Sequence, residues 1–333
     1  MARLRPSLVL GLAAAVAWAG VEARAEPPPA APEDASRSAP QLDVPGPPSE
    51  PGLSHTGTVF DLEYTAAGIT PTDVLSYAPI AGERAFAYAG RLAVETPLEL
   101  RTWYLGLAAG LAAASVPAGT APGSGGHAFV PSNPELWVRG LWSNRLGLSA
   151  GGSLGLVIPL PRKFGAVASE VVRTLRAVHP SDYPTFQDLT LTLRPSFVVR
   201  HVVGPLTLQG RQGLDLAVVT RDPVGREHRV ELGGVGSLFA SVAVVDELSL
   251  GLELAEVYAL SADVSSPECP APCDAQRFGV TLAPIVRVHS RWVSPALSLL
   301  VPLMTPLGGE AASYLAARLD LQVVAPWGLA DLW

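Results

Sequence analysis

The sequence has few charged residues, a single lysine and, beyond its N-terminus, no long hydrophobic run. Asp, Glu, Lys and Arg make up 16% of the 333 residues, whereas they make up about 25% of a typical soluble domain. Hydrophobic residues reach 48%, which is too apolar for most of the chain to stay disordered. The net charge is −7 and Lys163 is the one lysine. An acidic chain without a basic patch has no electrostatic footprint for nucleic acid.

The lack of long apolar runs excludes a bundle of membrane helices. The longest uncharged stretches after the N-terminus are 103–126, 146–161 and 292–309, and Gly or Pro interrupts each of them. None supplies the roughly 20 continuous apolar residues that a membrane-spanning helix needs. The chain is therefore rich in apolar residues, but they are distributed over many short segments.

Cysteine and clustered histidine are also scarce. The two cysteines, Cys269 and Cys273, lie in Cys-Pro-Ala-Pro-Cys, with no histidine within 15 residues on either side. Two thiols alone do not complete a zinc site, and their spacing is not that of a C-x-x-C redox motif. The pattern predicts a small disulfide formed in an oxidising compartment. The six histidines are dispersed without metal-ligand spacing, so no metal or cofactor is expected.

The N-terminus has the pattern of a secretory signal peptide. Arg3 and Arg5 precede an apolar core at Leu8–Ala19, and Ala23-Arg24-Ala25 forms an A-x-A cleavage site. Residues 1–25 are therefore predicted to be removed. Residues 26–54 follow as a disordered, proline-rich periplasmic tether, with nine prolines in 26–52. This segment is either an inert linker or a contact to the cell wall.

From residue 57 onward, hydrophobicity alternates with a period of two, which predicts strands with one apolar face. Leu250, Leu252 and Leu254, for example, alternate with Gly251 and Glu253. About twelve such segments occur: 57–66, 84–95, 99–113, 135–143, 145–159, 187–201, 205–219, 228–243, 247–260, 277–289, 292–304 and 313–325. Each is long enough for a tilted membrane strand of roughly 9–11 residues.

The connections between these segments alternate between short and long. Joins near 96–98, 144, 202–204, 244–246 and 290–291 are short, and those at 67–83, 114–134, 160–186, 220–227, 261–276 and 305–312 are long. An even number of strands with this alternation is the plan of a transmembrane antiparallel up-and-down β-barrel. We therefore predict an all-β barrel of about twelve strands over residues 55–333. Both termini would lie on the short-turn side, in the periplasm.

With these features the sequence resembles the Gram-negative outer-membrane β-barrel class, with no specific family recognised. The last strand alternates through Leu315, Leu319 and Val323, and the chain ends in Trp333 after interruptions at Pro326 and Asp331. A C-terminal aromatic residue resembles the signal that such barrels present to their insertion machinery. The resemblance implies an outer-membrane location in contact with membrane lipids.

Aromatic residues near strand ends are expected to form the girdles of a membrane barrel. They are Tyr64, Trp103, Trp142, Phe278, Trp292 and Tyr314. A soluble β-sandwich would also alternate, but one of its faces would meet water. The almost wholly apolar outer parity disfavours the sandwich.

The inward parity carries seven bases and six acids, which are the candidate lumen-lining residues. They are Asp61, Glu63, Arg91, Arg194, Arg200, Arg211, Asp215, Arg229, Glu231, Glu253, Arg287, Arg318 and Asp320. This near balance leaves two interpretations open: cross-strand ion pairs that fill the barrel, or a narrow polar pathway in which arginines favour anions. Twelve strands lie between eight, which side chains nearly fill, and sixteen, which leave a channel.

The long connection at 160–186 contains a helix-like stretch at 165–179. Val167, Val171, Leu175 and Val178 repeat at near-helical spacing, with basic residues around them. This segment is expected to cap the mouth of the barrel, to contact anionic lipopolysaccharide or to fold inward as a constriction.

Catalytic signals are poor. The segment 147–151 matches G-x-S-x-G, but strand alternation continues through it, whereas a nucleophile elbow needs a turn followed by a helix. We therefore predict a narrow or gated channel or transporter for small solutes, with the arginines favouring anionic ones. A structural or adhesive barrel tethered to the cell wall is the alternative. An outer-membrane lipid hydrolase using His228 is a distant third, because the serine partner is missing.

Overall fold

A single antiparallel sheet forms the wall of the protein. The computed structural model describes residues 57–71, 85–98, 102–116, 126–144, 146–160, 183–187, 189–220, 230–260, 278–290, 292–304 and 311–325. The strands are β1 (Thr58–Pro71), β2 (Ala85–Pro97), β3 (Trp103–Val116), β4 (Gly126–Pro131), β5 (Glu135–Ser143), β6 (Leu148–Val157), β7 (Thr190–Val203), β8 (Leu206–Val219), β9 (Val230–Val245), β10 (Leu248–Ala259), β11 (Phe278–Val288), β12 (Val293–Met304) and β13 (Ala311–Ala325). A short helix, α3 (Tyr183–Phe186), precedes β7.

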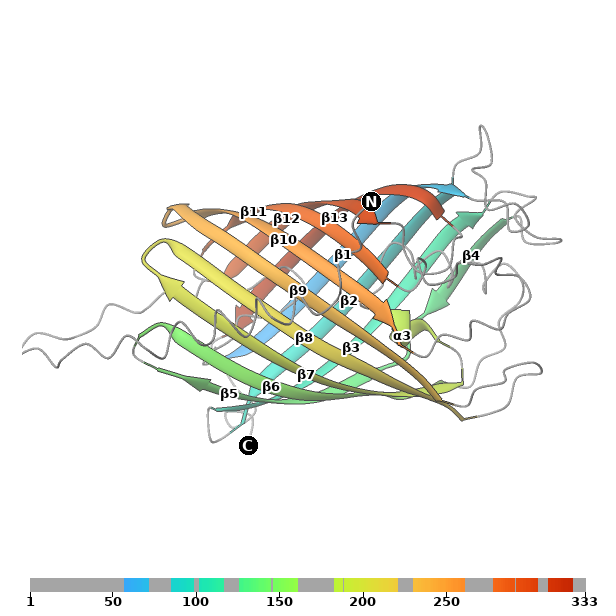
Figure 1. The fold of residues 1–333 in the computed structure, drawn as a ribbon, viewed down its shortest axis with the longest axis horizontal. Coiled ribbons are helices and arrows are strands. Elements are labelled where there is room, and N and C mark those ends of the chain that lie inside the picture. The colour runs from blue at the N-terminus through green and yellow to red at the C-terminus, as the bar shows by residue number, and fades with distance from the viewer. Residues whose placement is uncertain are drawn as a thin grey trace, which may run out of the picture. The chain divides into compact units, whose positions relative to one another are not determined.

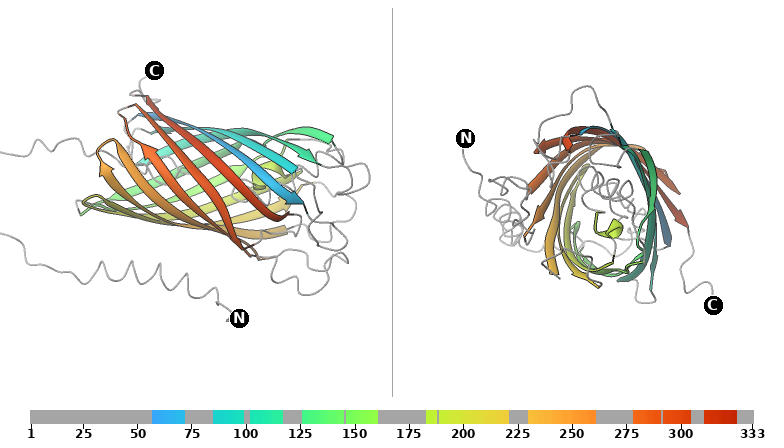
Figure 2. Two further views of the ribbon diagram at one scale, coloured as in Figure 1. Left: turned by 90° about the horizontal axis from the view of Figure 1, so that it is seen from above. Right: turned by 90° about the vertical axis from the view of Figure 1, so that its right-hand side faces the viewer.

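The sheet closes on itself (Figures 1 and 2). β1 pairs with β2 on one edge and with β13 on the other, with Thr58 opposite Ala325. The first and last strands therefore leave no open seam between them, and the strands run obliquely around a barrel as closure requires. The closed ladder excludes a soluble sandwich of two sheets.

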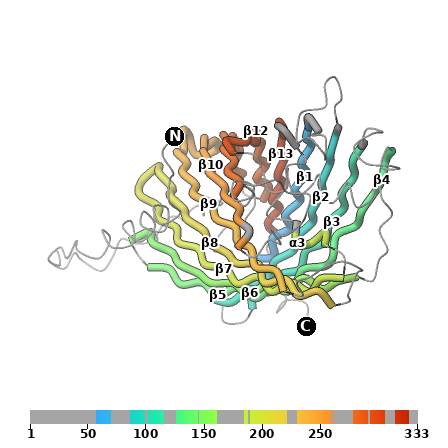
Figure 3. Tube along the Cα trace, turned by 45° about the vertical axis from the view of Figure 1, so that its right-hand side comes forward, coloured from blue at the N-terminus to red at the C-terminus, as the bar shows by residue number. Residues whose placement is uncertain are grey.

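β4 and β5 together occupy one position beside β3. β4 pairs with Leu111–Val116 of β3, and β5 pairs with Trp103–Ala108, so the two short strands lie at opposite ends of β3 (Figure 3). The barrel thus has twelve strand positions, and the prediction of about twelve strands is confirmed. The prediction that 114–134 is entirely a loop was wrong, because Gly126–Pro131 extends the wall along β3.

The connections alternate between the two rims of the barrel. β2 and β3, β5 and β6, β7 and β8, β9 and β10, and β11 and β12 follow each other within a few residues and meet at one rim, which we call the short-turn rim; the opposite one is the long-loop rim. Gly204 has a φ of +56°, a conformation that glycine adopts without cost. Asn144 Oδ1 accepts hydrogen bonds from the N–H groups of Leu146 and Leu148, which fixes another short turn.

The two faces of the wall differ in chemistry. In β10, Leu250 and Leu252 are 49% and 47% exposed, whereas Ser249 and Glu253 are 4% and 3% exposed. The leucines point outward and the polar side chains point into the barrel. The other strands repeat this arrangement, with a predominantly apolar outer face and an enclosed inner face, as expected for a barrel in hydrocarbon.

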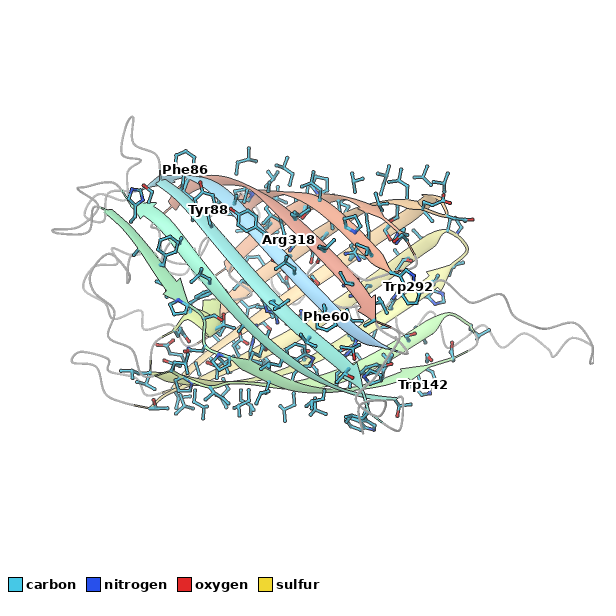
Figure 4. The ribbon with its side chains drawn as sticks, turned by 180° about the vertical axis from the view of Figure 1, so that it is seen from behind. Phe60, Phe86, Tyr88, Trp142, Trp292 and Arg318 are labelled. Carbon is cyan, nitrogen blue, oxygen red and sulfur yellow. The ribbon has the colours of Figure 1, made fainter. Side chains whose placement is uncertain are left out.

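Aromatic side chains on the outer face gather toward the rims (Figure 4). Phe86 and Tyr88 lie near the long-loop rim, whereas Trp142 and Trp292 lie near the short-turn rim. Tyr314 was wrongly expected among them. It is 6% exposed and its hydroxyl hydrogen-bonds Thr281 inside the barrel at 2.8 Å, because it shares the parity of Arg318 and Asp320.

The apolar outer face gives a first testable expectation. Leu252→Arg would place a charge against hydrocarbon, so the free energy of unfolding should fall by about 2–4 kcal/mol. Leu252→Phe keeps the face apolar and should cost far less. Urea titration of both variants in phospholipid vesicles checks the difference, and equal losses would contradict the assignment of the outer face.

Several expectations concern residues outside the described ranges. They are the signal peptide at 1–25, the tether at 26–54, the helical stretch at 165–179, His228, Arg229, the disulfide between Cys269 and Cys273, and Trp333. Within the part of the chain that the structure describes, no helix is long and apolar enough to cross a membrane.

Candidate functional site

Charged side chains gather on the inner face of the barrel. The structure places the described lumen candidates there: Asp61, Glu63, Arg91, Arg194, Arg200, Arg211, Asp215, Glu231, Glu253, Arg287, Arg318 and Asp320. Most are buried, because the opposite wall and its side chains cover them. Ionised groups so placed need partners, and the structure joins many of them in two networks.

The first, which we call the Glu135 network, connects β2, β5, β7 and β8. Glu135 contacts the guanidinium groups of Arg91 at 3.3 Å and Arg194 at 3.1 Å. Arg194 Nε also donates to Asp215 at 2.8 Å. One carboxylate therefore holds two arginines, and one of those arginines bridges to a second acid.

Aromatic rings extend the Glu135 network toward the short-turn rim. Trp137 Nε1 donates to Glu95 at 2.7 Å, and Glu95 also pairs with Arg139. The Arg139 guanidinium lies 4.8 Å from the centre of the Tyr104 ring, a distance typical of a cation–π contact. Trp137 lies over Gly106, where an added Cβ would overlap the indole.

The second, which we call the Arg318 network, lies on β10 to β13 (Figure 4). Arg318 donates to Glu253 at 2.7 Å and to Ser298 Oγ at 3.1 Å. Arg287 lies 4.0 Å from Asp320 and donates to Gln322 at 3.4 Å. In the ladder, Glu63 and Asp61 on β1 stand opposite Asp320 and Gln322.

The two networks lie on different sides of the lumen and differ in charge. In the order of strands around the barrel, β1 and β13 stand across from β7 and β8. On the inner faces of β1, β10, β11 and β13, the described carboxylates of Asp61, Glu63, Glu253 and Asp320 outnumber two arginines. On β2, β5, β7 and β8, the described arginines at 91, 139, 194, 200 and 211 outnumber three carboxylates. A solute between them would experience a field across the barrel.

A cavity of about 90 Å³ lies against the Glu135 network. Its polar lining includes Arg91, Arg139, Arg194, Arg211, Glu95, Glu135, Asp215, Ser153 and Ser196. A smaller cavity of about 10 Å³ lies next to α3, which is about the space of one water molecule. Arg91 is among the residues that line each of the two cavities.

On β1 to β4 and β11 to β13 the inner face near the long-loop rim is apolar instead of charged. A group of small and apolar side chains, here the alanine collar, surrounds Phe186 of α3. It comprises Ala67, Ile69, Ala87, Ala89, Ala112, Ala114, Val130, Ala283, Leu300, Tyr314 and Ala316. Seen along the barrel, α3 lies inside the ring of strands (Figure 2). The short alanine side chains leave room for the helix, and Phe186 is 3% exposed.

Asn133 holds α3 to the wall at the break between β4 and β5. Its backbone N–H donates to Thr185 O at 2.5 Å and its Nδ2 donates to Gln187 O at 2.6 Å. Its Oδ1 accepts from the N–H of Leu160 at 2.9 Å. Just beyond α3, Gln187 Nε2 donates to Glu231 at 3.4 Å. The chain entering β7 is thus fastened inside the barrel at two points.

Sequence reasoning missed three charged members of the Glu135 network. Glu95 shares the parity of Arg91 on β2, and Glu135 and Arg139 alternate with the outward Leu136 and Val138 on β5. Parity alone was therefore sufficient to find them. α3 and Asn133 had no comparable signal, because their role depends on contacts between distant segments.

Two other kinds of site, a metal centre and a serine nucleophile, can be compared with the described residues. No three His, Cys, Asp or Glu side chains among them come together as a metal site. Ser149 of the G-x-S-x-G match lies on β6, directly after a turn in which Gly147 has a φ of +77°. The strand–turn–helix of a nucleophile elbow is not formed there.

A closed antiparallel barrel with an apolar outer face, aromatic rims and a polar lumen has the architecture of an outer-membrane β-barrel. Searches against protein-family models and against curated proteins gave no match. Among solved structures, an outer membrane channel from Pseudomonas putida F1 is similar, with 12% identity and a TM-score of 0.60 over 83% of this chain and 99% of that chain. The NanC porin has 7% identity and a TM-score of 0.49, over 80% of this chain and 100% of that one. At such low identity the first of these likenesses establishes the fold alone.

Proposed function

We propose that this protein is a narrow, gated outer-membrane channel for small solutes, with a preference for anions. The observation that carries the proposal is a polar cavity of about 90 Å³ inside the barrel, which is room for several water molecules. If ion pairs only filled the lumen, their side chains would occupy this space. The similar channel from Pseudomonas putida F1 has the same fold and supports the proposal at that level.

The lining of the cavity supports the preference for anions. Four arginines, at 91, 139, 194 and 211, face it together with three carboxylates. Guanidinium groups fixed by neighbouring acids keep their positions while presenting N–H groups to a passing carboxylate or phosphate. Rings of basic side chains favour anions in pores.

Gating is assigned to α3. The helix lies in the part of the lumen lined by the alanine collar, and the smaller cavity lies directly beside it. A solute moving from the long-loop rim to the charged cavity would have to pass this helix. Its displacement would therefore open the path, and its return would close it.

Arg211→Gln tests the preference for anions, with Arg287→Gln as the control. Both variants remove one positive charge from the inner face, but only Arg211 lines the cavity. A unit charge near a passing ion is worth about 1 kcal/mol in water. The charge attracts an anion and repels a cation by about this amount each, so the anion-to-cation permeability ratio of Arg211→Gln should fall about 30-fold.

Reversal potentials across planar bilayers under a salt gradient measure this ratio. The shift should fade near 1 M salt, where the Debye length is about 3 Å. Arg287→Gln should change the ratio much less. Equal shifts in the two variants would contradict a pathway through the cavity.

The orientation in the membrane and the remaining partners are also proposals. β1 begins and β13 ends at the short-turn rim, so a periplasmic N-terminal segment would place this rim in the periplasm. In that orientation residues 26–52 could reach the cell wall, and Trp333 could meet the insertion machinery from the periplasmic side. Protease added to intact cells should then spare residues 26–54 and cleave only after the outer membrane is permeabilised.

A further inference from the structure

The outer face of the barrel carries one acidic side chain. Among outward positions of the described strands, Glu256 on β10 is the single Asp, Glu, Lys or Arg. Leu254 precedes it on the same face, and Leu208 and Leu214 flank the same level on β8. Glu256 therefore shares its face with exposed leucines, three residues before the end of β10. An ionisable residue in such a place indicates a functional contact, since exposure to hydrocarbon is costly.

Glu256 belongs to a polar cluster that spans three strands, which we call the outer-face patch (Gln212, Gly234, Gly236, Glu256 and Tyr258). Gln212 on β8 donates from Nε2 to the Tyr258 hydroxyl at 2.6 Å and to Val235 O at 3.2 Å. In the ladder, Gly236 stands opposite both Gln212 and Glu256, and Gly234 stands opposite Tyr258.

The glycines make the patch flat. A Cβ on Gly236 would lie 2.5 Å from Glu256 Oε1, and a Cβ on Gly234 would overlap the Tyr258 ring. The side chains of Glu256 and Tyr258 therefore lie across the backbone of β9. Small residues that allow close approach, combined with polar side chains, are the features of contacts between membrane-embedded segments.

The hydrogen-bonding groups of the patch complement themselves. The Tyr258 oxygen accepts from Gln212, so its hydroxyl hydrogen remains available to donate. The Glu256 carboxylate, two residues away on the same face, can accept. In a contact with two-fold symmetry, if residue i of one copy meets residue j of the other, then residue j of the first copy also meets residue i of the second. Tyr258 of each copy can therefore donate to Glu256 of the other.

We propose that the outer-face patch is the contact surface between two copies of this chain within the membrane. Pairing removes both carboxylates from the hydrocarbon and gives each a hydroxyl donor. The flanking leucines on β8 and β10 would pack around the polar centre. This proposal is independent of whether the lumen conducts.

The test counts the copies of the full chain per complex in liposomes by single-molecule photobleaching, at a series of protein-to-lipid ratios. The wild-type chain should form dimers. Glu256→Leu should weaken dimerisation about tenfold, the size expected for two symmetric hydrogen bonds in a membrane. Glu256→Gln keeps an acceptor oxygen and should retain most of the dimer. Leu92→Val, on the outer face of β2 across the barrel from β9, is the control and should leave dimerisation unchanged.

Folding is monitored in parallel by heat-modifiability on gels. Leucine suits an apolar face, so Glu256→Leu should fold as well as the wild type. Wild-type chains that remain monomeric at every ratio would overturn the proposal and leave lipid as the cover of the patch. Dimers that persist unchanged in Glu256→Leu would overturn it as well, because the contact would then lie elsewhere.

Discussion

Replacing Arg318 with Met should lower the free energy of unfolding by about 3–5 kcal/mol, the usual cost of breaking a buried ion pair. The Arg318 guanidinium is buried and donates to Glu253 at 2.7 Å. Methionine fills much of the same volume but removes the Arg318 charge from beside the Glu253 carboxylate, which is itself 3% exposed. Unfolding by urea in phospholipid vesicles, followed by tryptophan fluorescence, measures the loss.

A double variant tests whether the loss of stability in Arg318→Met comes from the broken ion pair or from lost packing. Arg318→Met combined with Glu253→Leu removes both charges, so most of the stability should return, because apolar side chains often replace a buried pair without loss. If the double variant is as unstable as the single one, the effect comes from packing and not from the ion pair.

Asn133→Ala should shift the channel toward its open state. The substitution removes the side-chain hydrogen bonds to Gln187 O and from Leu160 N. Only the bond to Gln187 O holds the α3 segment, and it is worth about 0.5–1.5 kcal/mol, so the closed arrangement should weaken by that amount. The ratio of open to closed channels should then rise roughly 2- to 13-fold. Single-channel recordings in planar bilayers give this ratio directly.

Asn144→Ala is the matched control for this experiment. Asn144 also uses its side chain to accept backbone hydrogen bonds, but it lies in the turn between β5 and β6 at the opposite rim. It should leave the open fraction unchanged. If neither the wild type nor Asn133→Ala conducts, the channel proposal fails and the structural or adhesive barrel becomes the better account.

The wall of the barrel was predictable because each strand repeats one simple rule. Leucines at 250, 252 and 254 point to lipid and the residues between them point inward, so alternation marks both the strand and its faces. The short connections then indicated that consecutive strands lie side by side in the sheet. Tyr314 was misplaced because its aromatic character was given more weight than its parity, which is that of Arg318.

The contents of the barrel were less predictable. β4 has six residues, begins with Gly and ends with Pro, so its period-two signal is too short to stand out. α3 has four residues, and its position comes from Asn133 and the alanine collar, which are far away in the sequence. The ion pairs join residues 21 to 65 positions apart. Strand parity predicts that such residues share the inner face, but it does not predict which acid pairs with which arginine.

The alanine collar also determines where solutes would be sorted by size. Its side chains are short and lie toward the long-loop rim on β1 to β4 and β11 to β13, whereas the arginines and carboxylates of those strands lie nearer the short turns. With α3 displaced, the lumen would be wide at the alanine collar and narrow where the charged side chains lie. A bulky molecule would enter freely and stop at this narrow part. A larger side chain in the alanine collar would therefore slow entry without changing the size of the largest solute that passes. A shorter side chain in place of an arginine would let larger solutes pass.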